Sequence, residues 1–206
     1  MGKLMKFSII SAAVLLMTGC TLSGAGKAAD QYYTALEEGD AEAAAAYFTE
    51  SAEDELENFR KITGGIQQMC ENYDPGEETE EELRSLLKTV VSHSYIRHEI
   101  KSVEKVSDTE YTVTADVEMV TDESSAACLE ALDYDSFYDE DAEELKEILQ
   151  NEGEEAAGRF AVTKMIHCLN LSSDTAFENA VYEKRTCRLS VILEGDVWKI
   201  RDIEKE

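Results

Sequence analysis

Alternating apolar and polar residues mark one kind of segment in this chain. From Tyr111 to Thr121 the alternation predicts a strand with one buried face. Ser107-Asp108 precedes this run and predicts a turn from an earlier strand over 98–106. Near the C-terminus, Glu194-Gly195-Asp196 separates two more strand-like runs and predicts a second hairpin. The sequence therefore predicts an antiparallel sheet.

Apolar residues at helical spacing precede the first hairpin and fill the gap between the two hairpins. The first run stops at Gly39, and Asp40 is suited to cap a second helix. A later run forms one apolar stripe over 78–91, and residues 122–180 are again helical in pattern. These patterns predict an α+β domain over 28–206: a curved antiparallel sheet wrapped by N-terminal helices, with a helical insertion before the C-terminal hairpin.

The N-terminus has a third pattern. Lys3 and Lys6 precede an apolar run of about 11 residues, which is the layout of a secretory signal and is too short to span a bilayer. The run ends in Met17-Thr18-Gly19-Cys20, which resembles the lipobox of bacterial lipoproteins. The resemblance implies that residues 1–19 are a removed signal peptide and that Cys20 carries lipid. The alternative is an ordinary signal with an accidental cysteine.

A lipidated Cys20 would place the protein on the extracytoplasmic face of a membrane. Two or three acyl chains make a stable anchor, whereas one chain does not. Residues 20–27 are then the lipidated cysteine and a short flexible tether, and the folded domain is predicted to begin at residue 28.

Charge narrows the possible partners. The chain has 45 acidic and 19 basic residues, a net charge of −26, and loss of the two signal lysines makes the mature chain −28. Nucleic acid and anionic lipid surfaces are bound by Lys/Arg patches that this composition lacks. A basic envelope protein or a small ligand remains as a possible partner.

Besides Cys20 the chain has Cys70, Cys128, Cys168 and Cys187, whose spacing matches no metal-ligand pattern. Four thiols packed as small apolar side chains are favoured over one disulfide, and the pairing stays open. Acids at 133, 135, 139, 141 and 144 follow the order of a calcium-binding loop, but Phe137 and Tyr138 occupy positions that need an oxygen and a glycine. No metal or cofactor is predicted.

Both ends of the domain resemble a known family. The start reads Tyr32-Tyr33-Thr34-Ala35-Leu36, then Glu38-Gly39-Asp40 and Ala46-Tyr47-Phe48, and the end reads Val191-Ile192-Leu193-Glu194-Gly195-Asp196-Val197-Trp198-Lys199-Ile200. These segments resemble the nuclear transport factor two-like cone fold and small lipoproteins of Gram-positive bacteria that share it. The family includes enzymes, binding modules and dimerisation domains, so the resemblance does not choose among them. The helical stretch 122–180 departs from the minimal fold.

The resemblance also suggests where a site would lie. Enzymes of this family that isomerise or dehydrate use a tyrosine with an acid inside the cone, and the candidates are Tyr32, Tyr33, Tyr111 and Asp116. Strand alternation places Tyr111 and Asp116 on opposite faces, which argues against that pair. Tyr32, Tyr111 and Trp198 are the expected pocket-lining residues. The histidines His93, His98 and His167 have no sequence neighbour that marks them as general bases.

The sequence thus favours a non-catalytic, membrane-anchored module that binds a small ligand or a partner protein at the cell envelope. A cone-fold enzyme acting on a small apolar substrate and a structural or oligomerisation module are the alternatives. Five acids within 77–82 open a predicted helix, where the helix dipole favours acids, and a basic partner is the functional interpretation of the same residues. No catalytic residue is predicted.

Overall fold

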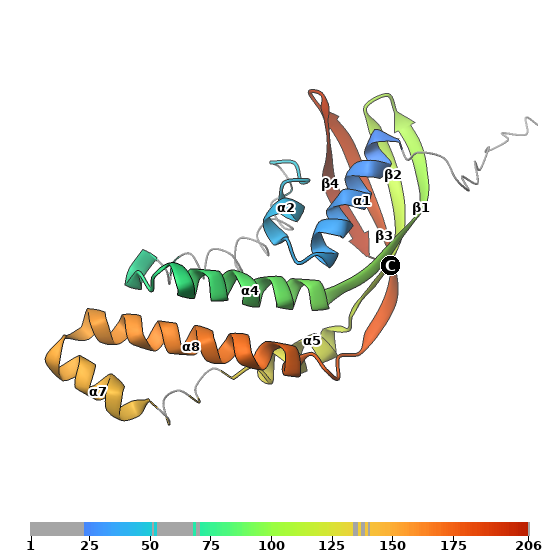
Figure 1. Ribbon diagram of the computed structural model, residues 1–206. Helices are drawn as coiled ribbons and strands as arrows, with labels where there is room; N and C mark the ends of the chain where they lie inside the picture. The colour runs from blue at the N-terminus through green and yellow to red at the C-terminus, as the bar shows by residue number, and fades with distance from the viewer. Residues whose placement is uncertain are drawn as a thin grey trace, which may run out of the picture.

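The computed structural model describes residues 23–50, 52, 68, 71–133, 136, 139 and 141–205. It shows the predicted α+β architecture, with helices before a curved antiparallel sheet and more helices before the last hairpin (Figure 1). The signal peptide and Cys20 lie outside the described residues. So does the helical run that the sequence suggests around Leu56, Phe59 and Ile62.

Over the residues just given, the sheet has four strands in the order β1-β2-β3-β4, each antiparallel to its neighbour. The strands are β1 Tyr95–Ser107, β2 Glu110–Val120, β3 Tyr182–Glu194 and β4 Val197–Lys205. Both predicted hairpins are confirmed. The alternation also holds, because Val113, Ala115 and Val117 are buried on the face of β2 that the helices cover.

Helix α1, Gly24–Glu37, lies across one face of the sheet, which we call the inner face (Figure 1). Helix α2, Ala41–Ala45, follows after a short turn, and the Asp40 side chain caps it by accepting a hydrogen bond from the Ala43 amide at 2.8 Å. After α2 the chain runs beside β4, and Phe48 forms a parallel bridge with Ile200. The main core lies between these segments and the sheet.

The start of α1 corrects the expected tether. Residues 24–27 were predicted to be flexible, but α1 begins at Gly24, Ser23 caps it through a hydrogen bond to the Gly26 amide, and Ala25 is fully buried. Small residues in this segment look like a linker in sequence. Here they form a helical turn because only small side chains fit against the sheet. In the predicted tether of residues 20–27, only Cys20 to Ser23 precede the helix.

The other helices that the structure describes form an elongated unit, which we call the arm. Helices α4, Glu77–Ser94, and α8, Glu154–Ala176, lie side by side, with α5, Asp122–Glu130, near the sheet and α7, Ala142–Asn151, at the far end (Figure 1). Helix α4 runs directly into β1 at Ser94 and Tyr95. The arm has its own core, formed by Leu83, Leu86, Leu132, Val162, Ile166 and Leu169.

Charge is divided unevenly between the sheet and the arm. The four strands hold nine Lys/Arg and nine Asp/Glu residues, so they are neutral as a set. The segments 71–94 and 122–180, which contain the arm, hold 23 acids and five Lys/Arg. Most of the surplus negative charge of the chain therefore belongs to these segments. Among the described helices, none has the length and apolar character needed to cross a bilayer.

Candidate functional site

The inner face of the sheet is filled by side chains of the chain itself. Tyr32, Tyr33 and Leu36 of α1 are almost completely buried there, together with Phe48. The rings of Tyr32 and Phe48 meet edge to face with centroids 5.3 Å apart, and Tyr32 also contacts Tyr33. Native-like packing of this kind leaves little room for a ligand between α1 and the sheet, as far as the described residues go. The buried tyrosines are therefore core residues.

Tyr33 carries an unusual polar group in this core. Its hydroxyl is buried and has no conventional hydrogen-bond partner among the described residues, and the Cys187 thiol beside it is only a weak partner. Burial raises the pKa of Tyr33 well above its ordinary value of 10.0, and the neighbouring Cys187 and Tyr32 raise it further. The phenol therefore stays protonated at neutral pH, where it is not available as a general base.

His98 of β1 lies between two carboxylates of α1. Its Nδ1 is 2.6 Å from Glu37 Oε1 and its Nε2 is 3.1 Å from Asp30 Oδ1. The ring stacks on Tyr33 at 5.4 Å between centroids, and only 9% of the histidine side chain is exposed. Each ring nitrogen therefore has a carboxylate oxygen of α1 within hydrogen-bonding distance. This cluster joins α1 to the sheet.

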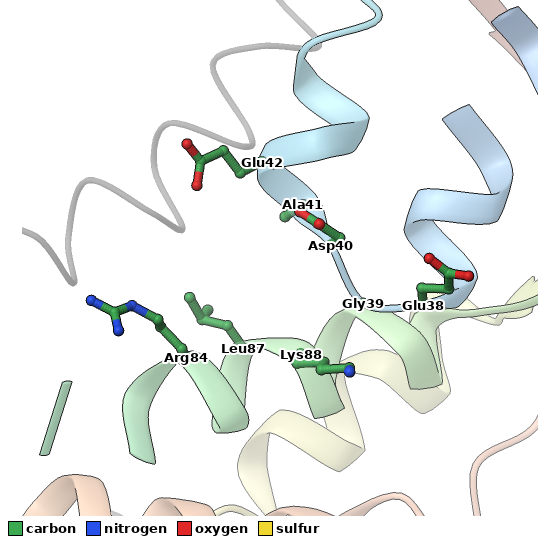
Figure 2. Close-up of a pocket in the computed structure, with 8 residues that line it drawn as sticks. All are labelled: Glu38, Gly39, Asp40, Ala41, Glu42, Arg84, Leu87 and Lys88. Carbon is green, nitrogen blue, oxygen red and sulfur yellow. The ribbon is translucent and has the colours of Figure 1, made fainter. Parts of the chain in front are cut away.

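A cleft lies where the turn between α1 and α2 approaches α4 (Figure 2). Its volume is about 330 Å³, at the lower end of the range of small-molecule sites. Its lining includes three acids, two bases and one large apolar side chain: Glu38, Asp40, Glu42, Arg84, Lys88 and Leu87, with Gly39 and Ala41. The mixture of charges suits a small polar ligand with both signs of charge.

Gly39 sets how closely the two walls of this cleft approach. It has φ +77°, and a Cβ at this position would lie 2.3 Å from the Lys88 carbonyl oxygen. Asp40 is occupied in capping α2, and Arg84 pairs with Glu80 at 3.2 Å. The lining side chains thus offer carboxylates, a guanidinium and an ammonium group to a ligand.

The outer face of the sheet is polar. Asp116 lies there, where it accepts a hydrogen bond from Thr186 at 3.2 Å and pairs with Lys101 at 3.5 Å. Hydrogen bonding to Glu99 and the charges of Glu99 and Asp116 raise the pKa of Lys101. Tyr111 is on the opposite face, as the strand alternation predicts, and so Asp116 and Tyr111 do not form a catalytic pair. The hollow beside Asp116 measures about 20 Å³, room for one water molecule.

Trp198 lies at the start of β4 and joins three elements. A Cβ on Gly24 of α1 would lie 2.3 Å from the Trp198 Nε1 atom, so the indole packs directly on the first residue of the helix. Its ring meets Tyr111 of β2 edge to face, with centroids 5.3 Å apart. Trp198 and Tyr111 are partly buried against the main core, and Tyr32 is inside it. None of these three residues lines the cleft of Figure 2.

The remaining candidates have structural contacts. His93 Nδ1 is 2.7 Å from the Thr89 carbonyl oxygen, and His167 Nδ1 is 2.9 Å from Glu82. Asp133 accepts a hydrogen bond from the Ser136 amide and Asp141 pairs with Lys164, while Asp135 lies outside the described residues. No set of three or more potential metal ligands gathers in the described part of the chain.

Three of the cysteines lie in the described part of the chain. Cys128 and Cys187 are buried, and Cys168 is half-buried. The Ser136 hydroxyl lies 3.5 Å from the Cys168 sulfur. Cys70 lies outside the described residues.

Sequence reasoning missed the His98 cluster and the cleft. Asp30 and Glu37 are seven residues apart in a helix, which places them on one face, but His98 is 61 residues beyond Glu37. The cleft joins residues near 40 with residues near 86, and no local pattern reports that contact. No protein-family model, curated protein or solved structure matches this chain.

Proposed function

We propose that the protein is a lipid-anchored, extracytoplasmic binding module without catalytic activity, and that the acidic arm binds a basic partner protein. The observation that carries this proposal is the filled inner face of the sheet. An enzyme or a ligand carrier with this sheet would need an open cup, and here Tyr32, Tyr33 and Leu36 occupy the space. Binding is therefore assigned to the outside of the molecule.

The arm is the part of that outside best suited to a protein partner. It has its own core, so it keeps its form as a unit away from the sheet. Its segments hold 23 acids against five bases, whereas the strands are neutral. Such a field raises the rate of encounter with a basic surface and makes binding sensitive to salt.

Site-specific crosslinking in the host tests the proposal. A photoreactive residue at Glu147, an exposed position of α7, should capture one defined protein, and the same residue at Glu104 of β1, also exposed, should not. With that protein purified, Glu143→Lys/Glu147→Lys should weaken binding and reduce its salt dependence. The matched control is Glu104→Lys/Glu204→Lys, which makes the same charge change on the strands. Equal effects of the two pairs would contradict an arm-specific site.

The cleft of Figure 2 supports a second function, binding of a small ligand with both signs of charge. Native mass spectrometry of protein from its own host, compared with refolded protein, would reveal a ligand as an extra mass lost on refolding. Lys88→Gln should reduce retention of that mass. Lys146→Gln, an exposed lysine of α7, is the control. A clean mass in the unrefolded protein would remove this second function and leave the partner protein.

A further inference from the structure

The first residue of α1 is held firmly against the sheet. Gly24 packs on the Trp198 indole so closely that no larger residue fits, and Ala25 is fully buried. Trp198 is itself fixed by Tyr111 of β2. The point where the chain enters the domain is therefore a rigid part of the sheet's hairpin end.

The distance from this point to the proposed lipid is limited by covalent geometry. Cys20 precedes Gly24 by four residues. An extended chain spans about 3.5 Å per residue, so the two Cα atoms lie within about 14 Å of each other. Acyl chains on Cys20 would hold the surface around Gly24 close to the lipid headgroups.

Both hairpin turns lie at the same end of the molecule as the start of α1 (Figure 1). The Leu193 amide donates to the Thr109 carbonyl at 2.9 Å, which joins the two turns. Beside the turns, Val106 and Val197 are 61% and 56% exposed. The charges of Lys105 and Asp108 form a local pair at 2.6 Å. This end offers two exposed valines and a neutralised ion pair to a surface, together with the exposed carboxylates of Glu194 and Asp196 in the turn between β3 and β4.

The arm joins the sheet at the other end of the strands. Helix α4 enters β1 at Tyr95, whereas β1 reaches its hairpin turn at Ser107, 12 residues later. At about 3.3 Å per residue, the two ends of β1 are at most about 40 Å apart, and the bulges of the strand shorten this distance. A bilayer that touches the hairpin end therefore lies well away from the arm.

We propose that the hairpin end of the sheet, formed by the turns 107–110 and 194–197 around Gly24 and Trp198, rests on the lipid surface and that the arm is held on the side away from the membrane. This rests on the proposed lipid anchor and adds the orientation of the domain. The short link, rather than charge attraction, enforces the contact. The acidic arm is then presented to proteins away from an anionic leaflet.

Trp198 makes the orientation measurable, because it is the single tryptophan of the chain. Lipidated protein purified from host membranes would be reconstituted in phosphatidylcholine vesicles containing headgroup-spin-labelled lipid, which quenches nearby fluorophores. Trp198 should lose most of its emission. A variant with the tryptophan moved to the arm, Trp198→Phe/Gln150→Trp, should keep its emission. Inserting a long Gly/Ser segment between Leu22 and Ser23 should leave vesicle binding intact and restore Trp198 emission.

The outcomes separate the two proposals. Protein that floats with vesicles but shows equal quenching at Trp198 and at position 150, or none at either, would overturn the orientation and leave the anchor standing. Protein that fails to float, or whose N-terminal peptide carries no lipid by mass spectrometry, would overturn the anchor and the orientation with it. Quenching that is unchanged by the inserted segment would also overturn the role of the short link.

Discussion

The Nδ1 atom of His98 lies 2.6 Å from Glu37 Oε1, on a different element 61 residues earlier in the chain. A hydrogen bond to a charged group contributes more to folding stability than a neutral one does. Because Glu37 is partly exposed, we expect this hydrogen bond to contribute about 1 kcal/mol. We expect Glu37→Gln to lower the free energy of unfolding by about that amount, measured by urea unfolding. Glu38→Gln, at the exposed neighbouring position, should have little effect.

A double-mutant cycle with His98→Gln should show coupling between His98 and Glu37. Strictly additive losses would mean that the observed contact does not contribute to stability.

Gly39 should tolerate no side chain. Gly39→Ala introduces backbone strain at φ +77° and a contact of 2.3 Å with the Lys88 carbonyl, so we expect a loss of at least about 2 kcal/mol in unfolding free energy. Gly195→Ala is the control, since it has a similar φ of +61° but no atom within 4 Å of the added Cβ. It should lose only about 1 kcal/mol. Equal losses of unfolding free energy in the two variants would show that close packing of α4 against Gly39 does not contribute to the effect.

Tyr33 should make the fold sensitive to alkali. Burial raises the pKa of Tyr33 above 10.0 in the folded protein. Above about pH 10 the unfolded chain therefore releases a proton that the folded chain keeps. The contribution of Tyr33 to the free energy of unfolding is constant below that pH and falls as the pH rises above it. Between about pH 8 and about pH 11, Tyr33→Phe should therefore lose less stability in urea unfolding than the parent protein. Tyr73→Phe, at an exposed tyrosine, should behave like the parent.

The two cores should respond separately to cavities. Ile166→Ala removes a fully buried side chain of the arm and should speed hydrogen exchange of α8 amides, while amides of β2 and β3 stay protected. Leu189→Ala makes a similar cavity in the main core and should do the reverse. Each change should cost about 2–4 kcal/mol locally. Uniform acceleration across both units in both variants would show one cooperative core instead.

The strands were the most predictable part of the fold. The alternation around Val113 and Val117, and Gly195 in the last turn, set the faces and the hairpins through local chemistry alone. The helical insertion was also predictable, from apolar spacing over 122–180. The packing of this insertion against α4 was not predictable, because it depends on contacts between residues 84 positions apart, such as Thr79 and Thr163.

The start of the domain shows why small residues mislead. The segment Ser23-Gly24-Ala25-Gly26 has the composition of a flexible linker, and its helix is stabilised by Trp198, which is more than 170 residues away. The site was less predictable than the fold for the same reason. Both the His98 cluster and the cleft of Figure 2 join residues that only tertiary packing brings together.

The direct passage from α4 into β1 gives the arm an adjustable length. No loop separates Ser94 from Tyr95, so the root of the arm is fixed by the sheet, while its far end is formed by α7, which packs on α8 (Figure 1). Adding one matched turn to α4 and to α8 would move the far end outward by about 5.4 Å without changing either root. Insertions made in such pairs would lengthen the arm in steps of one helical turn, and the attachment of the arm to the sheet would stay the same.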